Sequence, residues 1–196
     1  MIDIQNAMVN TAGAYVSIDG LYPFHLGITP WQGRIPVVRL GGHREGDETG
    51  WQCAAREVHE ETGLRIRPLV PRATYWADGD LPAPELQEIG WDRPGDEGNL
   101  PLLVVSYLRE GRKLLSLMYL AEAGELPVPS SEVQGLLLPD REKIHWLCQE
   151  PRTLEQYLGR GGKAIMTGSF ECSLVLEPFI QLRLFARILA AQAGGC

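Results

Sequence analysis

Short apolar runs separated by turn residues recur along the chain and predict β-strands. Segment 64–70 alternates apolar and basic residues, as a half-buried strand does. Segments 102–108 and 114–120 flank Glu110-Gly111-Arg112, a turn sequence, and predict a hairpin. The strands predicted in this way cover residues 14–18, 25–29, 35–40, 64–70, 102–108, 114–120 and 133–138.

Three segments have the character of helices. Segment 49–62 consists of helix-forming residues and ends at Gly63, which suits the left-handed position after a helix. Segment 153–158 opens with Thr-Leu-Glu-Gln, a capping-box pattern. Segment 177–191 carries Pro178 at a plausible first helical position, and its wide apolar face predicts burial or a place in an interface.

The order of these elements indicates the fold class. Mixed strands come first, then one central helix, then more strands, then helices at the C-terminal end. This order favours an α/β sandwich with a mixed sheet over a regular repeat of strand, helix and parallel strand.

Composition narrows the class of protein further. The chain has 196 residues, of which 44% are hydrophobic and 22% charged, values that are ordinary for a globular domain. No apolar run is long enough for a membrane span, and the N-terminal residues lack a leader pattern, so we expect a cytoplasmic protein. The four cysteines form no CxxC pair, which argues against a disulfide framework or a zinc site.

Charge is unevenly distributed along the chain. The net charge is −7, and no cluster of Lys and Arg suggests nucleic-acid binding. Segment 76–100 is predicted to be a long loop, and it holds seven acidic residues against the single base Arg93. Such a loop would repel an anionic ligand, so either it folds away from a site for one or its acids hold metal. Trp76 and Trp91 flank the acidic residues and are candidates for stacking on a planar ring of a ligand, with core packing as the alternative.

Three glutamates in segment 49–62 carry the chemistry. Glu57, Glu60 and Glu61 are three or four positions apart, so they crowd one face of the predicted helix, where like charges repel. A divalent cation would remove the repulsion, and such oxygen ligands suit Mg²⁺, Mn²⁺ or Ca²⁺. The alternative is a solvated acidic face. Gly41-Gly42, which follows a strand, permits close approach of backbone to a ligand.

This stretch resembles the Nudix box, G-x5-E-x7-R-E-U-x-E-E-x-G-U, in which U is a bulky aliphatic residue. All nine specified positions are filled, by Gly42, Glu48, Arg56, Glu57, Val58, Glu60, Glu61, Gly63 and Leu64. The resemblance implies an α/β/α sandwich with the box as a loop–helix–loop. We therefore expect residues 1–150 to form a Nudix hydrolase domain. Residues 151–196 would form a helical extension packed on that domain or in a dimer interface.

The resemblance also implies roles for the box residues. Glu57, Glu60 and Glu61, with the carbonyl group of Gly41, would bind catalytic Mg²⁺ or Mn²⁺. Arg56 would orient Glu48 near the metal, although a salt bridge that only anchors the loop would also explain this pair.

A carboxylate must accept the proton of the attacking water in such a reaction. Glu57 or Glu60 could do so within the box. Glu132 is the leading candidate outside the box, with Glu97 in the acidic loop next; an ordinary surface position is the alternative for both.

The implied activity is metal-dependent hydrolysis of a phosphoanhydride bond in a nucleoside diphosphate linked to another moiety. The family marks that would specify this moiety are absent: Gly79 and Leu81 stand where a proline or a tyrosine would point to a particular substrate. The alternatives are a catalytically silent nucleotide-sensing or regulatory module and a non-hydrolytic enzyme on the same scaffold. The intact box favours the hydrolase, and a homodimer is compatible with the family.

Overall fold

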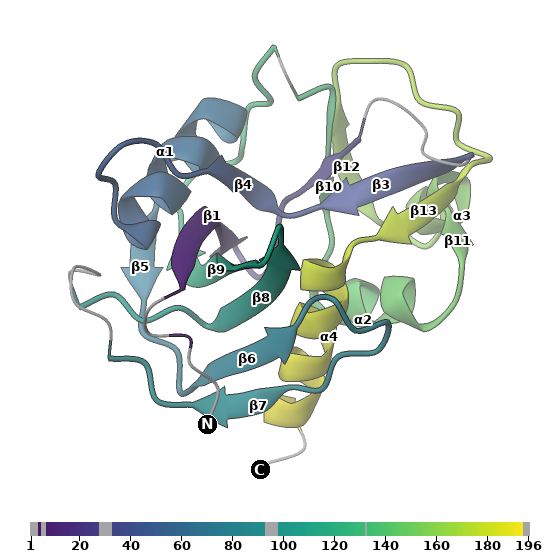
Figure 1. Ribbon diagram of the computed structural model, residues 1–196. Helices are drawn as coiled ribbons and strands as arrows, with labels where there is room; N and C mark the ends of the chain where they lie inside the picture. Colours follow the sequence, from purple (N-terminus) through teal and green to yellow (C-terminus); the bar gives the residue numbers. More distant parts are fainter. Residues whose placement is uncertain (1–3, 5–6, 28–32, 93–97, 132, 194–196) are drawn as a thin grey trace.

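The computed structural model describes residues 4, 7–27, 33–92, 98–131 and 133–193 (Figure 1). Within these residues the chain folds into two mixed β-sheets and four helices. The helices are α1 (Gly50–Thr62), α2 (Arg141–Gln149), α3 (Leu154–Gly159) and α4 (Ile180–Ala193). No helix in this described part of the chain is long and apolar enough to cross a bilayer.

The first sheet has the strand order β4-β1-β9-β8-β6-β7, and β5 pairs with the end of β9. The pairs β1–β9 and β6–β8 are parallel, whereas β8 and β9 form the predicted antiparallel hairpin. The strands are β1 (Met8–Ser17), β4 (Leu40–His43), β5 (Arg67–Leu69), β6 (Thr74–Asp78), β7 (Gln87–Ile89), β8 (Leu103–Arg109) and β9 (Arg112–Glu122).

The second sheet has the order β11-β13-β3-β2-β10-β12. Its strands are β2 (Phe24–Leu26), β3 (Arg34–Val38), β10 (Gly135–Leu138), β11 (Arg152–Thr153), β12 (Lys163–Met166) and β13 (Val175–Pro178). Only Arg39 separates β3 from β4, so the chain passes from the second sheet to the first at this residue.

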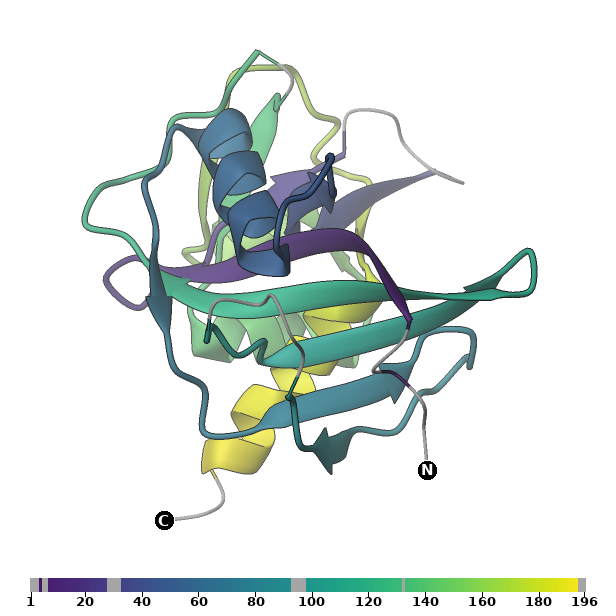
Figure 2. The ribbon, with the colours of Figure 1, turned by 60° about the vertical axis from the view of Figure 1, so that its left-hand side comes forward.

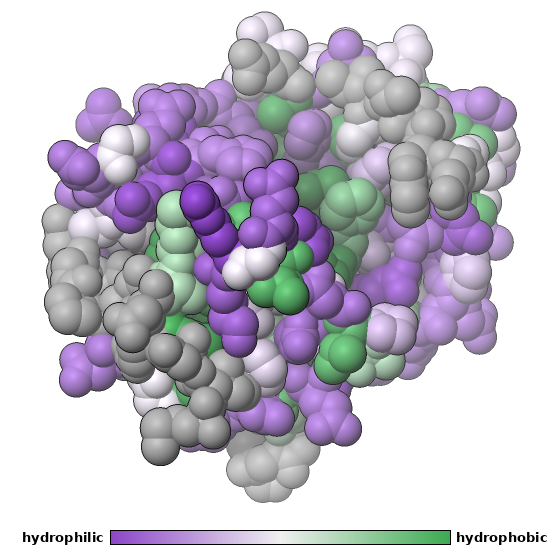
Figure 3. Space-filling model, viewed as in Figure 1, coloured by the Kyte–Doolittle hydropathy of each residue, from purple (hydrophilic) through white to green (hydrophobic). Residues whose placement is uncertain are grey.

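Helices α1 and α4 cover opposite faces of the first sheet (Figure 2). The alternation of side chains along β1 shows why. Ala14 belongs to a buried cluster with Ala54 and Val58 of α1, whereas its neighbour Tyr15 stacks on Phe185 of α4 with ring centroids 3.9 Å apart. The predicted α/β/α sandwich is thereby confirmed. Hydrophilic side chains cover most of the surface in Figure 3, with apolar surface exposed near the centre of that face.

Several predicted elements differ from the observed ones. Segment 76–100 is not a loop throughout, because β6 reaches Asp78 and β7 pairs with it. Pro178 does not begin a helix: it ends β13, whose parallel pairing with β3 keeps the chain extended, and α4 begins at Ile180. The predicted strand 35–40 is divided between two sheets at Arg39. Helix α2 was not predicted, although Asp140 caps it by accepting from the Lys143 amide.

Candidate active site

Helix α1 has well-defined ends, which fix the positions of its glutamates. Thr49 and Gln52 form a reciprocal capping box at the start, and Gly63 ends the helix with φ of 70°. Cys53 and Val58 are fully buried against the first sheet. The helix is therefore held at both ends and along one face.

Arg56 gathers the acidic residues of the box. Its Nε and Nη2 donate to the two carboxylate oxygens of Glu48 at 2.6 and 3.0 Å, and its Nη1 donates to Glu57 and Glu60 at 2.9 Å each. Nη2 also donates to the carbonyl oxygen of His43 at 2.9 Å. The predicted contact between Arg56 and Glu48 is confirmed. The hydrogen bond that Arg56 donates to Glu48 raises the pKa of the guanidinium, so this cation stays charged.

The glycines of β4 bring the backbone against the glutamates. The Gly41 amide donates to Oε2 of Glu61 at 2.9 Å. A side-chain carbon at Gly42 would overlap the carboxylate of Glu57, so another residue here would displace that carboxylate from its present position. Glu57 and Glu61 therefore converge on the Gly41-Gly42 segment from one side.

The donor set suits a hard divalent cation. The side chains present carboxylate oxygens beside a strand backbone, the ligand type that Mg²⁺ and Mn²⁺ prefer. In the described residues, no three His, Cys, Asp or Glu side chains are already arranged around a common point as cation ligands. Arg56 accounts for this, because it holds one oxygen of Glu57 and one of Glu60. A metal would share or replace these bonds.

Acid should loosen the ion pair between Glu48 and Arg56. The hydrogen bond from Arg56 holds the pKa of Glu48 below its ordinary value. A carboxyl whose folded-state pKa is lowered stabilises the fold above its unfolded-state pKa, and this contribution is lost as the pH falls through the folded-state pKa. We expect the unfolding free energy from urea denaturation to drop as the pH falls below the ordinary pKa of a glutamate, about 4.3, toward the lowered pKa of Glu48, and to drop less steeply in Glu48→Gln. Glu155→Gln, at an exposed position of α3, is the control; equal slopes for Glu48→Gln and wild type would contradict the prediction.

A cleft of about 320 Å³ lies beside Gly41, between residues of β1, β4, β8 and β9 and the start of α4. Arg39 lines it and is only 8% exposed, with Nη1 donating to the carbonyl oxygen of Ala12 at 3.4 Å. Burial lowers the pKa of Arg39, and the nearby carboxylate of Glu61 counteracts this. A buried cation thus lines the cleft and lies near enough to Glu61 for the two charges to influence each other.

Polar side chains from distant segments complete the cleft. Gln181, at the start of α4, donates from Nε2 to the hydroxyl group of Tyr107 at 3.3 Å. Ser116 is 3% exposed, and within the described residues its Oγ has no hydrogen-bond partner. A buried hydroxyl without a partner is costly, which makes Ser116 an unusual residue to find in the lining of the cleft.

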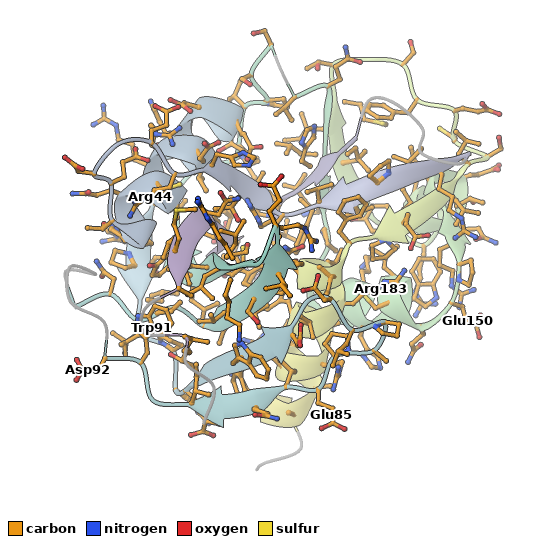
Figure 4. All side chains as sticks on the ribbon, viewed as in Figure 1. Arg44, Glu85, Trp91, Asp92, Glu150 and Arg183 are labelled. Carbon is orange, nitrogen blue, oxygen red and sulfur yellow. The ribbon has the colours of Figure 1, made fainter. Side chains whose placement is uncertain are left out.

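The other predicted site residues lie elsewhere or outside the described residues. Trp76 is buried, and its indole nitrogen donates to Ser106 Oγ at 3.1 Å. Trp91 packs against the cluster that contains Val58, far from Arg183 of α4 in Figure 4. Neither tryptophan lines the cleft. The two candidate proton acceptors beyond the box, Glu132 and Glu97, lie outside the described residues.

Part of the acidic segment folds onto the β8–β9 hairpin. The Asp80 carboxylate accepts from the Leu108 amide at 2.6 Å and from Arg109 Nη1 at 2.7 Å. The bond from Leu108, followed by that from Arg109, lowers the pKa of Asp80. The negative charge of Asp80 is therefore matched locally by a cation.

Residues 24–105 match the family model described as the NUDIX domain. The chain contains a NUDIX domain. Two solved Nudix structures have a similar fold: a NUDIX-family hydrolase from Clostridium perfringens, 13% identical over 93% of this chain and 96% of that one, with a TM-score of 0.52, and a C. elegans Ap4A hydrolase, 14% identical over 96% and 100%, with a TM-score of 0.50. The curated proteins give no match. The Nudix fold thus extends beyond the matched domain to the C-terminal helices.

Sequence reasoning missed the cleft beside Gly41. Arg39, Ser116 and Gln181 come from three separate segments, which only the tertiary fold brings together. One local signal was present. Arg39 is a charged residue inside the apolar run 35–40, and a charge in such a run is costly unless it serves a partner or a ligand.

Proposed function

We propose that this chain is a metal-dependent pyrophosphohydrolase that cleaves the phosphoanhydride bond of a nucleoside diphosphate derivative. One observation carries the proposal: the complete box holds its carboxylates against the β4 glycines, and a buried arginine lines a cleft beside Gly41. Such a reaction needs carboxylates that hold a metal ion, and it needs a positive charge nearby that attracts the phosphate.

In this proposal Glu57, Glu60 and Glu61 hold Mg²⁺ or Mn²⁺, with the carbonyl group of Gly41 as a further ligand. When bound, the metal would neutralise phosphate oxygens and lower the pKa of a water molecule. The carboxylate donors match that requirement, and the backbone of Gly41 already lies within hydrogen-bond distance of Glu61.

Two arginines would bind the phosphate chain and position the carboxylates. Arg39 would offset the charge of the phosphate chain from within the cleft, where low exposure strengthens the attraction. Arg56 would position Glu48, Glu57 and Glu60 as it does in the structure.

The reaction itself needs one proton acceptor. Glu57 or Glu60 would take a proton from the attacking water as its oxygen bonds to phosphorus and the bridging P–O bond breaks. The electron pair of that bond leaves with the departing phosphate. Glu132 is the candidate acceptor outside the box.

A silent sensing module is the alternative, and the site argues against it. Such a module has no need for Arg56 to hold three carboxylates together, or for a glycine that allows Glu57 to approach the strand. Neither feature is needed by a protein that only binds a nucleotide and does not cleave it.

The test is a panel of nucleoside diphosphate derivatives incubated with Mg²⁺ or Mn²⁺, with release of monophosphate as the measurement. We expect turnover of at least one compound, and a fall of about 100-fold or more in Glu60→Gln and Glu61→Gln, since even indirect partners of metal ligands cost about 10–100-fold. Glu155→Gln is the matched control. Circular dichroism would verify that the variants fold. Unchanged turnover in both box variants would remove the metal role, and no turnover of any compound would favour the silent module.

A further inference from the structure

A second cavity lies between α2, α4 and the connection from β6 to β7. Its volume is about 550 Å³, larger than that of the cleft beside Gly41. The walls are mostly apolar, with Pro82 and Pro84 on the connection and Cys148 and Leu184 on the two helices. Arg183, labelled in Figure 4, lies on its α4 side. None of the Nudix box residues lines this cavity, so its chemistry is separate from that of the carboxylates.

Phe179 joins the two cavities. Its side chain lines both of them and is 38% exposed, which is high for an aromatic ring beside a buried core. Its backbone is fixed, because the Phe179 amide donates to the carbonyl oxygen of Val37 on β3 at 3.0 Å. Residue Phe179 therefore has a fixed backbone position between the cleft beside Gly41 and the apolar cavity.

The opposite wall of the second cavity is also anchored. Nη1 of Arg187 on α4 donates to the carbonyl oxygen of Pro84 at 2.6 Å, which ties the β6–β7 connection to the helix. At the α2 side, His145 and Gln149 lie with their ring and amide nitrogens 2.7 Å apart and supply polar atoms to a lining whose accessible surface is mostly apolar. Most ligand pockets share this composition, apolar walls with a few placed polar groups.

We propose that the substrate lies across Phe179, with its phosphates in the cleft against Arg39 and its nucleobase in the cavity between α2 and α4. The inference rests on the proposed function, because that function supplies the phosphate in the cleft. A nucleobase is a flat apolar ring with polar edges, which suits proline and phenylalanine walls together with the nitrogens of His145 and Gln149.

A sugar or another polyhydroxylated group fits this cavity poorly. Each hydroxyl group taken from water needs a partner, and the charged residues of the lining already have theirs: Arg183 pairs with Glu177, and Arg187 donates to the Pro84 carbonyl oxygen. The same reasoning places such a polar moiety outside the cavity, toward solvent. The base, and not the second moiety of the substrate, is therefore the part that this cavity selects.

The test compares ligands that differ only in the base and cannot undergo the proposed hydrolysis. The ligands are the four ribonucleoside monophosphates, with ribose 5-phosphate as the baseless control, and calorimetric titration gives each Kd. We expect one or more nucleotides to bind the wild type about tenfold or more tightly than ribose 5-phosphate, as stacking of a base on an aromatic ring implies.

A pair of neighbouring alanines on α4 gives matched variants. Both are exposed, but Ala190 lines the cavity and Ala191 does not. Ala190→Trp should fill the cavity and abolish the advantage of the nucleotide while leaving ribose 5-phosphate binding unchanged. Ala191→Trp should change neither. Phe179→Leu should weaken nucleotide binding alone, and Arg39→Met should weaken both ligands.

The outcomes separate this inference from the proposed function. Equal Kd values for nucleotides and ribose 5-phosphate in the wild type would overturn the base subsite. Nucleotide binding that survives Ala190→Trp would do the same, even if the panel shows hydrolysis. Base-dependent binding that Ala190→Trp abolishes would support the subsite, even if the panel shows no hydrolysis and the catalytic proposal fails.

Discussion

Replacing Arg56 with methionine is expected to reduce turnover by about 100-fold or more and to lower the unfolding free energy by about 1–3 kcal/mol. The guanidinium holds Glu48, Glu57 and Glu60, and its side chain is only 23% exposed. Removing the cation leaves three carboxylates without their shared partner, so they repel one another and the metal ligands lose their positions. The stability figure lies below that of a fully buried pair because water reaches part of this network.

Two further variants make the Arg56 experiment specific. Arg44→Met removes a cation from the exposed loop before α1, labelled in Figure 4, and should leave turnover and stability nearly unchanged. Arg56→Lys keeps the charge but lacks the fork of donors that binds Glu48 at two points, so it should restore stability more than turnover. Wild-type turnover and wild-type urea unfolding in Arg56→Met would show that the network has no role in either property.

Truncating Phe185 to alanine is expected to lower the unfolding free energy by about 3–5 kcal/mol. Phe185 is fully buried, stacks on Tyr15 with the rings 4° from parallel, and meets the edge of Tyr22 at a centroid distance of 5.3 Å. The variant loses both ring contacts and leaves a cavity under the first sheet. Urea denaturation followed by circular dichroism measures the change.

Phe179→Ala is the matched control, because this second phenylalanine is six positions earlier and partly exposed. Its effect on stability should stay within about 1 kcal/mol. A single unfolding transition in Phe185→Ala, shifted to lower urea, would show that α4 unfolds with the sheet that it covers. A separate early transition, with the main one unshifted, would mean that α4 contributes nothing to the stability of the first sheet.

Local signals were sufficient to predict the helix of the box. Thr49, Gln52 and Gly63 are capping residues whose effect depends on their immediate neighbours, and α1 begins and ends where they indicate. The contact between Arg56 and Glu48 also followed from short spacing in the sequence. The fold class was predicted from the order of strands and helices along the chain, and this order stays the same when the boundary of a single element is misplaced.

Long-range pairing explains what the sequence did not reveal. Pro178 was assigned to a helix because its local context permits one, but hydrogen bonding between β13 and β3, some 140 residues apart, keeps it extended. The cleft has the same origin. Its polar residues Arg39, Ser116 and Gln181 are each ordinary in their own segments, and only the packing of α4 against the first sheet brings them together.

Only one residue, Arg39, connects β3 to β4, so the chain has little conformational freedom at the point where the two sheets meet. Val38 is paired within one sheet and Leu40 within the other, so Arg39 has little freedom to relax if either sheet shifts. Side chains alternate along a strand, and one extra residue here would turn the following positions to the opposite face, carrying the Gly41 amide away from Glu61. The number of residues between β3 and β4 therefore fixes the position of Arg39 relative to the glutamates of the box.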